Sequence, residues 1–219
     1  MIQPGVFTKE GRFTLKDKAM IQLREAILSG RLAPGSRLIE QELSSMMGIS
    51  RFPLREAIAG LEQEGLVTIE PYKGGHVCKP SAGEIAEVYS VRELLETHAL
   101  ELLMQQDDPG IVANLHSIVD SMDTRNNHEG GNFMYADFSF HNAICEAAGN
   151  ATLHKMWLTL STKIQIYINM ELHSESMTVL KKNHSFLCKV IESGDVDAAV
   201  AELREHLRRG KRSLLGSVE

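Results

Sequence analysis

The feature that most constrains this chain is a short helix, a tight turn and a longer helix between residues 41 and 67. Gly48 allows the chain to reverse between the two helices. Ser50 is placed to cap the second helix, and Pro53 lies in its first turn, where a missing N–H costs nothing. Apolar residues in that helix recur at helical spacing and predict one buried face: Leu54, Ala57, Ile58 and Leu61. The stretch is typical of a helix-turn-helix motif.

Three side chains project from the opposite face of the second helix, near its N-terminal end: Arg51, Phe52 and Arg55. Two arginines at this place can reach base edges and phosphates in a major groove. The alternative is an ordinary solvated helix face, because most helical arginines only keep a protein in solution. The helix pattern alone leaves both interpretations open.

Two short β-prone segments follow the helix at once, over residues 66–70 and 75–79. The intervening residues 71–75 are typical of a hairpin turn. A helix-turn-helix followed directly by a hairpin is a winged helix. Lys73 and Gly74 are then expected at the tip of the wing, where a slim backbone can approach a minor groove. The hairpin therefore favours DNA binding.

This region resembles the GntR family of bacterial transcription regulators over about residues 15–80. The matching residues are 27–35, Leu38, 49–57, Leu61, 64–67, Pro71 and 74–75. Phe52 departs from the family, in which a small polar residue is more usual at this position. The resemblance implies operator DNA as the partner, contacted through Arg51, Phe52, Arg55, Lys73 and Gly74. One winged helix covers only a half-site, so we expect a homodimer on a near-palindrome.

Charge is divided unevenly along the chain. Residues 1–80 carry 11 Lys and Arg against 9 Asp and Glu, a net charge of +2, whereas residues 81–219 carry 12 against 20, a net charge of −8. This asymmetry assigns a polyanionic partner to the first part of the chain. The excess is small, so affinity should depend on the placement of the cations and on dimerisation.

The three cysteines are odd in number and unclustered, which argues against a disulfide framework: Cys78, Cys145 and Cys188. Cys145 and Cys188 fall in apolar helical patterns and are expected in the core. No stretch approaches the ~18 apolar residues of a membrane helix, and the N-terminus lacks a signal-peptide core. We therefore expect a cytoplasmic protein without a membrane partner and with a polar N-terminal arm over about residues 1–13.

A domain boundary is expected at Pro80, dividing a winged helix-turn-helix domain over 1–80 from a second domain over 81–219. Ser81 and Glu84 form a capping box, so a new helix begins directly after the wing. Turn signals divide the second domain into six predicted helices: 82–106, 109–125, 131–148, 151–173, 176–193 and 195–215. Short connections favour antiparallel neighbours. The predicted fold class is mainly α, with a winged helix followed by an all-α antiparallel bundle.

Four polar side chains lie on the predicted inner faces of three bundle helices: Asp137, His141, His184 and His206. Burying them without partners would cost several kcal/mol, so either they pair with one another or they share a cation. A single inward histidine is more often a hydrogen-bonded core residue. Asp137 and His141 lie one turn apart and point at one place, where facing helices can add ligands. This donor set suits Zn²⁺, with Ni²⁺, Mn²⁺ or Fe²⁺ as alternatives.

The resemblance extends through the second domain. Residues 89–96, 137–141, 148–150 and 202–206 are similar to the FCD domain of the FadR-type branch, and six helices are similar to its VanR-like subgroup. Many members of this branch bind a divalent metal through one Asp and three His. The matching positions here are Asp137, His141, His184 and His206.

Arg92 and Glu96 share the inner face of the first helix of the bundle, one turn apart. They can form a purely structural salt bridge. Alternatively, the Arg92 guanidinium faces the cavity and holds a carboxylate, and Glu96 steadies it. In the family the corresponding arginine commonly lies in the effector pocket. We therefore expect a small organic acid to bind at Arg92 and Glu96.

The expected function is ligand-responsive transcription regulation, with repression as the commoner outcome. A small acid at the metal site would shift the dimer towards a spacing that fits DNA poorly. One alternative is a metal sensor, in which the cation itself is the signal. Another is a metal-dependent hydrolase, in which the same four ligands activate water. No general base is paired with the site, so no catalytic residue is assigned and an enzyme is not expected.

Overall fold

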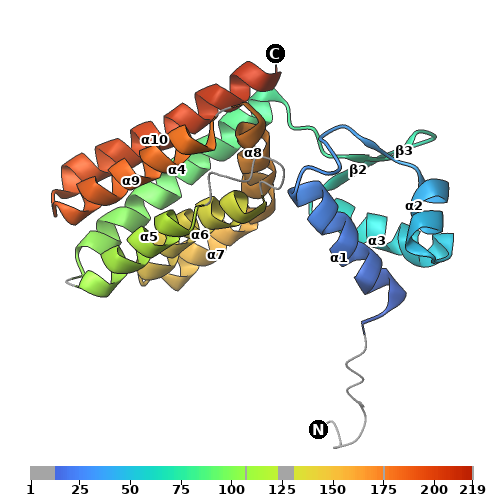
Figure 1. Cartoon of the computed structure of the whole chain (residues 1–219), viewed down its shortest axis with the longest axis horizontal. Helices are drawn as coiled ribbons and strands as arrows, with labels where there is room; N and C mark the ends of the chain where they lie inside the picture. The colour runs from blue at the N-terminus through green and yellow to red at the C-terminus, as the bar shows by residue number, and fades with distance from the viewer. Residues whose placement is uncertain (1–12, 107, 123–130, 175, 219) are drawn as a thin grey trace, which may run out of the picture. The chain divides into compact units, whose positions relative to one another are not determined.

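The structure is a computed structural model of the chain, and it describes residues 13–106, 108–122, 131–174 and 176–218 (Figure 1). The chain divides into two compact units. One unit comprises residues 1–26 with 35–78, and the other comprises residues 27–34 with 79–219. Nearly all of the polar arm expected over residues 1–13 lies outside the described residues.

The first unit is a winged helix-turn-helix. Its elements are α1 (Leu15–Leu28, of which the last two residues are counted with the other unit), β1 (Arg37–Leu38), α2 (Glu40–Met47), α3 (Arg51–Gln63), β2 (Val67–Glu70) and β3 (Gly74–Val77). The three strands form an antiparallel sheet in the order β1-β3-β2, with Val67 opposite Val77. Strand β1 was not predicted, because two residues are too short to show an alternating pattern.

The helix-turn-helix follows from local chemistry. Gly48 ends α2 with a φ of 63°, a left-handed conformation that reverses the chain at low cost in a residue without Cβ. Ser50 occupies the N-cap position of α3 with extended backbone, but its side chain makes no capping hydrogen bond. The predicted inner face is confirmed, since the four apolar residues are all buried: Leu54, Ala57, Ile58 and Leu61.

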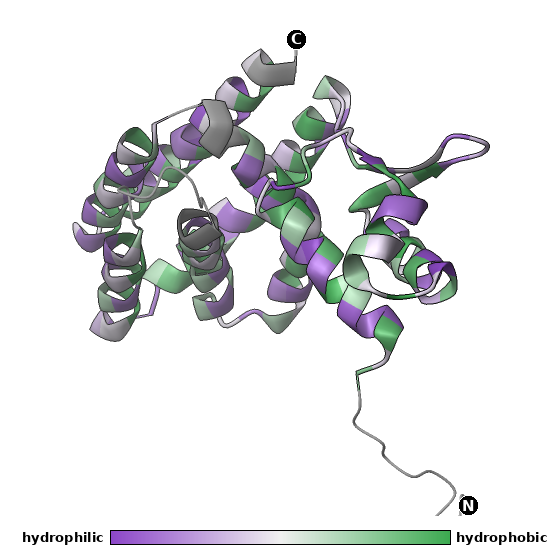
Figure 2. Ribbon diagram, turned by 45° about the vertical axis from the view of Figure 1, so that its right-hand side comes forward, coloured by the Kyte–Doolittle hydropathy of each residue, from purple (hydrophilic) through white to green (hydrophobic). Residues whose placement is uncertain are grey.

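The second unit is an all-α bundle over the residues that the structure describes. Its helices are α4 (Ala82–Met104), α5 (Pro109–Ser121), α6 (Gly131–Ala147), α7 (Ala151–Thr159), α8 (Ser161–Ser174), α9 (Met177–Glu192) and α10 (Val196–Val218). Helix α10 packs against α4, α8 and α9, and α6 packs against α4, α5, α7 and α8. In Figure 2 these helices change between hydrophobic and hydrophilic segments along their length, as amphipathic helices do.

The prediction of one continuous helix over 151–173 is wrong at Leu160. There the Leu160 N–H donates to the carbonyl of Trp157, three residues back, at 2.9 Å, and a new helix starts at Ser161. Figure 1 shows α8 turned away from the direction of α7. The break contains neither Gly nor Pro, so no turn signal marked it. The described part of this unit therefore has seven helices, and the expected six-helix subgroup is not confirmed.

Side-chain caps fix two helix starts in the bundle. The Ser81 hydroxyl accepts a hydrogen bond from the Glu84 N–H at 3.1 Å, which confirms the predicted start of α4. Asn150 caps α7 by accepting from the Leu153 N–H at 3.1 Å. The predicted turn at 126–132 lies largely outside the described residues.

Two of the cysteines are core residues, as predicted. Cys145 and Cys188 are fully buried, and burial raises the pKa of the Cys188 thiol to about 12. Such a thiol stays protonated and packs as a small apolar group. Within the described residues, no helix combines the length and the apolar character needed to cross a membrane.

Candidate metal centre and nucleic-acid interface

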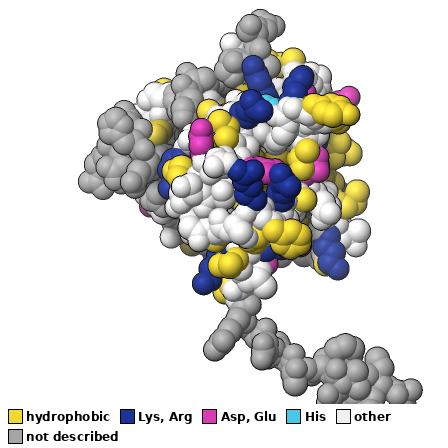
Figure 3. All heavy atoms as spheres, turned by 90° about the vertical axis from the view of Figure 1, so that its right-hand side faces the viewer, with side chains coloured by type: hydrophobic (Ala, Val, Ile, Leu, Met, Phe, Trp, Pro, Cys, Tyr) yellow, Lys and Arg dark blue, Asp and Glu magenta, His cyan; other side chains and the backbone are white. Residues whose placement is uncertain are grey.

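The predicted DNA-contacting side chains lie exposed at the N-terminal end of α3. Arg51 and Arg55 are exposed, and the large apolar side chain of Phe52 is 72% exposed beside them. Figure 3 shows Lys and Arg side chains, with hydrophobic and acidic ones among them, on the side of the molecule that faces right in Figure 1. This end of α3 can therefore offer both charge and apolar surface to a groove.

Two of the predicted DNA contacts are engaged in exposed ion pairs. Arg55 Nε lies 2.7 Å from Glu40 Oε2, and Lys73 Nζ lies 2.7 Å from Glu70 Oε2. The hydrogen bond with Glu70 raises the pKa of Lys73, so this side chain stays cationic. Exposed pairs of this kind contribute little to stability. A phosphate oxygen can therefore replace either carboxylate at small cost.

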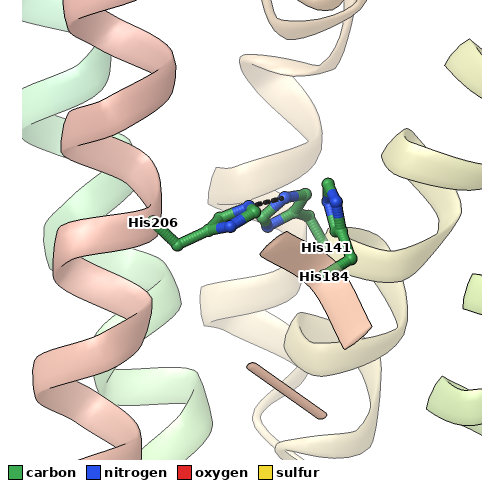
Figure 4. Close-up of side chains that lie close together, drawn as sticks. All are labelled: His141, His184 and His206. Atoms are coloured by element: carbon green, nitrogen blue, oxygen red, sulfur yellow. Dashed lines mark hydrogen bonds between the residues drawn. The ribbon is translucent and has the colours of Figure 1, made fainter. Parts of the chain in front are cut away.

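Three histidines from three helices converge in the interior of the bundle: His141 on α6, His184 on α9 and His206 on α10. Figure 4 shows their rings turned towards one another. One ligand atom from each lies within 4.8 Å of the others, and the Nε2 atoms of His141 and His206 are 3.3 Å apart. His141 and His184 are each 1% exposed. The helices thus place three imidazoles around one point.

Asp137 adjoins this cluster. It lies one turn before His141 on α6, is buried, and places Oδ1 3.0 Å from Nε2 of His184. The structure therefore brings together the four polar residues that were predicted to face inward.

Hydrogen bonds on the far side of two rings fix which nitrogen faces the cluster. Nδ1 of His141 lies 2.7 Å from Glu96 Oε2, and Nδ1 of His184 lies 2.8 Å from the carbonyl oxygen of Leu180. Both partners can only accept, so both Nδ1 atoms carry the proton. The Nε2 lone pairs are then directed to the cluster, and such outer partners are typical of metal-ligating histidines.

This arrangement fits a divalent cation. In neutral His184 the Nε2 lone pair would face the Asp137 carboxylate at 3.0 Å, which is repulsive unless a proton or a cation lies between them. Separations of 3.0 and 3.3 Å match neighbouring ligands around an ion with bonds of ~2.1 Å. The third ring lacks an outer partner of this kind, because Nδ1 of His206 is buried and has no hydrogen-bond partner in the described part of the chain. Three imidazole nitrogens and one carboxylate oxygen are a donor set that zinc accepts.

The predicted pair of Arg92 and Glu96 belongs to a buried hydrogen-bond network beside the cluster. Glu96 Oε1 accepts from Arg92 Nε at 2.7 Å and from Trp157 Nε1 at 2.8 Å, while Oε2 faces His141. The Arg92 guanidinium also lies over the Tyr89 ring, 5.4 Å from its centroid. The sequence left two alternatives for Arg92, a salt bridge with Glu96 or a position facing the cavity. The structure shows both.

Burial and neighbouring charges set the protonation states here. Burial alone would raise the pKa of Glu96, but Arg92 and His141 lower it to about 2. Burial would likewise raise the pKa of Asp137, but His184, His141 and Arg92 lower it. Burial lowers the pKa of His141, and it lowers that of His206 well below the usual value. Near neutral pH the carboxyls are therefore ionised and these imidazoles neutral, as metal ligands must be.

A small cavity of about 20 Å³ opens at the cluster, enough for about one water molecule. Its lining residues are Tyr89, Arg92, Asp137, His141, Leu180, Asn183, His184, His206, Leu207, Arg209 and Gly210. Arg92 therefore faces the cavity, whereas Glu96 does not line it and supports Arg92 and His141 from behind.

Arg209 is a cavity residue that sequence reasoning missed. Its Nη2 donates to Glu202 Oε1 at 2.6 Å, and its Nε is buried without a hydrogen-bond partner in the described residues. Its position three residues after His206 on α10 is the signal that could have identified it. Trp157 was also missed, because nothing in its sequence context indicates a hydrogen bond to a buried carboxylate.

Comparison with known proteins agrees with both units. Residues 15–77 match the model of the gntR family of bacterial regulatory proteins, and residues 87–209 match the FCD domain. An HTH-type transcriptional regulator from an unstable DNA locus of Streptomyces ambofaciens is 30% identical over 90% of this chain and 84% of its own. The gluconate operon transcriptional repressor of Bacillus subtilis is 28% identical, and the match covers 84% of this chain and 79% of the repressor.

Solved structures show the same fold. A GntR transcriptional regulator from Rhodococcus sp. RHA1 superposes with a TM-score of 0.76 at 21% identity, covering 92% of this chain and 97% of its own. McbR/YncC of E. coli superposes with a TM-score of 0.72 at 19% identity, covering 95% of this chain and 100% of its own. At such identities the likeness concerns the fold alone.

Proposed function

Because this chain belongs to the GntR family of bacterial regulatory proteins and carries an FCD domain, we propose that it is a cytoplasmic repressor released from operator DNA by a small carboxylate. Members of the family bind operator DNA and usually dimerise. They are transcriptional regulators and not enzymes, which disfavours the hydrolase alternative. The observation that carries the proposal is the convergence of three histidines and Asp137 on a cavity, in the same chain as a winged helix.

On the DNA side, Arg51 and Arg55 are our choice for base and phosphate contacts, with Lys73 and Gly74 at the wing. On binding, phosphate oxygens would replace Glu40 as the ion-pair partner of Arg55 and Glu70 as the partner of Lys73. Arg51→Ala should weaken operator binding by on the order of 1–3 kcal/mol. A gel-shift titration at fixed salt measures this loss, and an unchanged affinity would remove Arg51 from the interface.

In the bundle, the divalent cation that we propose is Zn²⁺, and the residues that would hold it are Asp137, His141, His184 and His206. A bound cation would supply positive charge and open coordination positions for a carboxylate oxygen. Glu96 keeps the Nδ1 of His141 protonated and its Nε2 directed inward. The carbonyl of Leu180 does the same for His184.

A carboxylate would meet two guanidinium groups in this cavity. Arg92 is anchored through Nε by Glu96, which leaves its terminal nitrogens to face a ligand. Arg209 brings a buried Nε that lacks a partner among the described residues, and an anionic oxygen would satisfy it. Since the cavity holds about one water molecule, a larger acid must move the wall that α10 provides. This movement is the two-state element by which we propose that the ligand shifts the dimer away from DNA.

The test combines metal content, ligand binding and DNA binding in the same samples. The purified chain should carry about one equivalent of metal and lose it in His206→Ala. His116→Ala is the matched control, because His116 is a partly exposed histidine that pairs with Glu192 elsewhere in the bundle. Acetate, lactate and gluconate would be titrated by calorimetry with and without chelator. Carboxylate binding that is indifferent to chelator and to His206→Ala would contradict the metal-linked mechanism.

The small cavity also favours a second candidate, a sensor for the metal itself. A volume of about 20 Å³ accommodates a single small ion without any movement of α10. In that case buffered Zn²⁺ alone would change operator affinity, and none of the carboxylates would change it further. Carboxylate-dependent release at constant metal occupancy would exclude the sensor.

A further inference from the structure

The wing contains a strained tyrosine that the proposed DNA contacts do not use. Tyr72 has a φ of 66° and is the single non-glycine residue with positive φ among the residues that the structure describes. It is the third residue of the turn that joins β2 to β3, after Pro71, and the Lys73 N–H closes this turn on the Glu70 carbonyl at 3.2 Å. A turn with Pro second and positive φ third favours Gly or Asn at the third place.

Among the described residues, no packing contact of the Tyr72 ring offsets this strain. The Tyr72 side chain is 106% exposed, so its ring buries no apolar surface against the protein. An aromatic residue in a left-handed conformation is a genuine outlier, and such strain persists where it serves a function. Asn at this position would keep the turn and remove most of the strain.

The surroundings of Tyr72 indicate which partner it meets. The next residue is a lysine, and Gly74 follows with a φ of 89° and no atom within 4 Å of the place a Cβ would take. The tip of the wing therefore combines an exposed ring, a cation and a backbone open to close approach. Glu70, the nearby acid, is already engaged by Lys73. This combination suits DNA, which offers both phosphate charges and the apolar edges of its sugars, better than it suits an apolar protein surface.

We propose that Tyr72 is a DNA contact, whose ring packs on deoxyribose in the minor-groove wall and whose hydroxyl donates to a phosphate oxygen. The inference rests on the proposed DNA binding of the winged helix and adds a residue that the GntR-like pattern did not include. The left-handed backbone at Tyr72 costs the hairpin stability in the free protein, and the fully exposed ring gains contacts only when DNA is bound.

The test measures hairpin stability and DNA affinity in the same variants of the full chain. The probe is a duplex isolated from random DNA by repeated selection on the wild-type protein. Tyr72→Asn should slow amide hydrogen exchange in β2 and β3 severalfold, because it relieves the strain. It should also weaken binding to the duplex by on the order of tenfold. Tyr72→Phe keeps the ring and the strain, so exchange should stay unchanged and affinity should fall by less.

Arg51→Ala separates the failure of this inference from that of the proposed function. Weakened binding in both Arg51→Ala and Tyr72→Asn supports the tip contact. Weakened binding in Arg51→Ala alone, with wild-type affinity in Tyr72→Asn, overturns it and leaves the helix face in place. If neither variant loses affinity for the duplex, both the Tyr72 contact and the proposed DNA contact of α3 are overturned. Faster exchange in Tyr72→Asn would overturn the claim that the tyrosine is strained.

Discussion

The winged helix and the histidine bundle use charged side chains in opposite ways. At the winged helix, Arg55 and Lys73 form ion pairs with Glu40 and Glu70 that are open to solvent. In the bundle, Arg92 is 3% exposed and its partner Glu96 is fully buried, with further bonds to other helices. Exposed pairs exchange readily for other anions, whereas a buried pair cannot lose one member without a large penalty. The first region can therefore change partners, and the second keeps its geometry.

Removing the buried carboxylate tests this contrast most severely. Glu96→Gln should lower the free energy of unfolding by about 3–5 kcal/mol, because Arg92 would stay buried without its counter-charge. Urea unfolding followed by circular dichroism measures the change.

The matched control is Glu101→Gln on the same helix. Glu101 also contacts a histidine, with His98 Nδ1 3.1 Å from Glu101 Oε2, but this pair is exposed. Its loss should change the free energy of unfolding by less than about 0.5 kcal/mol. Equal effects of the two substitutions would show that burial does not distinguish the pairs.

Metal addition tests whether the histidine cluster is a preformed site. Zn²⁺ at a hundredfold excess over its dissociation constant should stabilise the wild-type chain by about 2.7 kcal/mol. Calorimetry would show this as a higher unfolding temperature, and the increase should vanish in His184→Ala but persist in His154→Ala. His154 is a suitable control because it pairs with Asn142, outside the cluster, at 2.9 Å. An equal increase in the His184 variant would place the metal elsewhere.

The smallest expected effect concerns an exposed pair. Glu40→Gln removes the carboxylate next to Arg55 and should strengthen DNA binding by at most about fivefold at low salt, since such pairs are worth ~0.2–1 kcal/mol. The gain should shrink as salt is added, because the charge is exposed. A gel-shift series over several salt concentrations measures it. Weaker binding would mean that Glu40 positions Arg55 for DNA rather than competing with it.

Local patterns predicted the winged helix well. The turn at Gly48 and the inner face of α3 depend on neighbouring residues, so the chain shows them directly. The inward positions of His141, His184 and His206 could also be read from helical spacing, and the helices bring them to one point. Strand β1 and the break at Leu160 could not be predicted, because neither has a local composition signal.

The outer partners of the cluster were harder to foresee. Trp157 lies 61 residues from Glu96 along the chain, and its hydrogen bond depends on how α7 packs against α4. Arg209 faces the cavity because of its place on α10 beside His206. Helical periodicity shows which side of a helix is buried, but not which polar groups on other helices meet it. Such pairings need the packed structure.

The bond from Trp157 to Glu96 has a practical consequence. The chain contains a single tryptophan, and its indole N–H is held by the same carboxylate that orients His141. Indole emission responds to the electric field around the ring, so the colour and intensity of its fluorescence should change when a cation or an acid occupies the cluster. The protein thus carries an intrinsic optical probe at its centre, which needs no label.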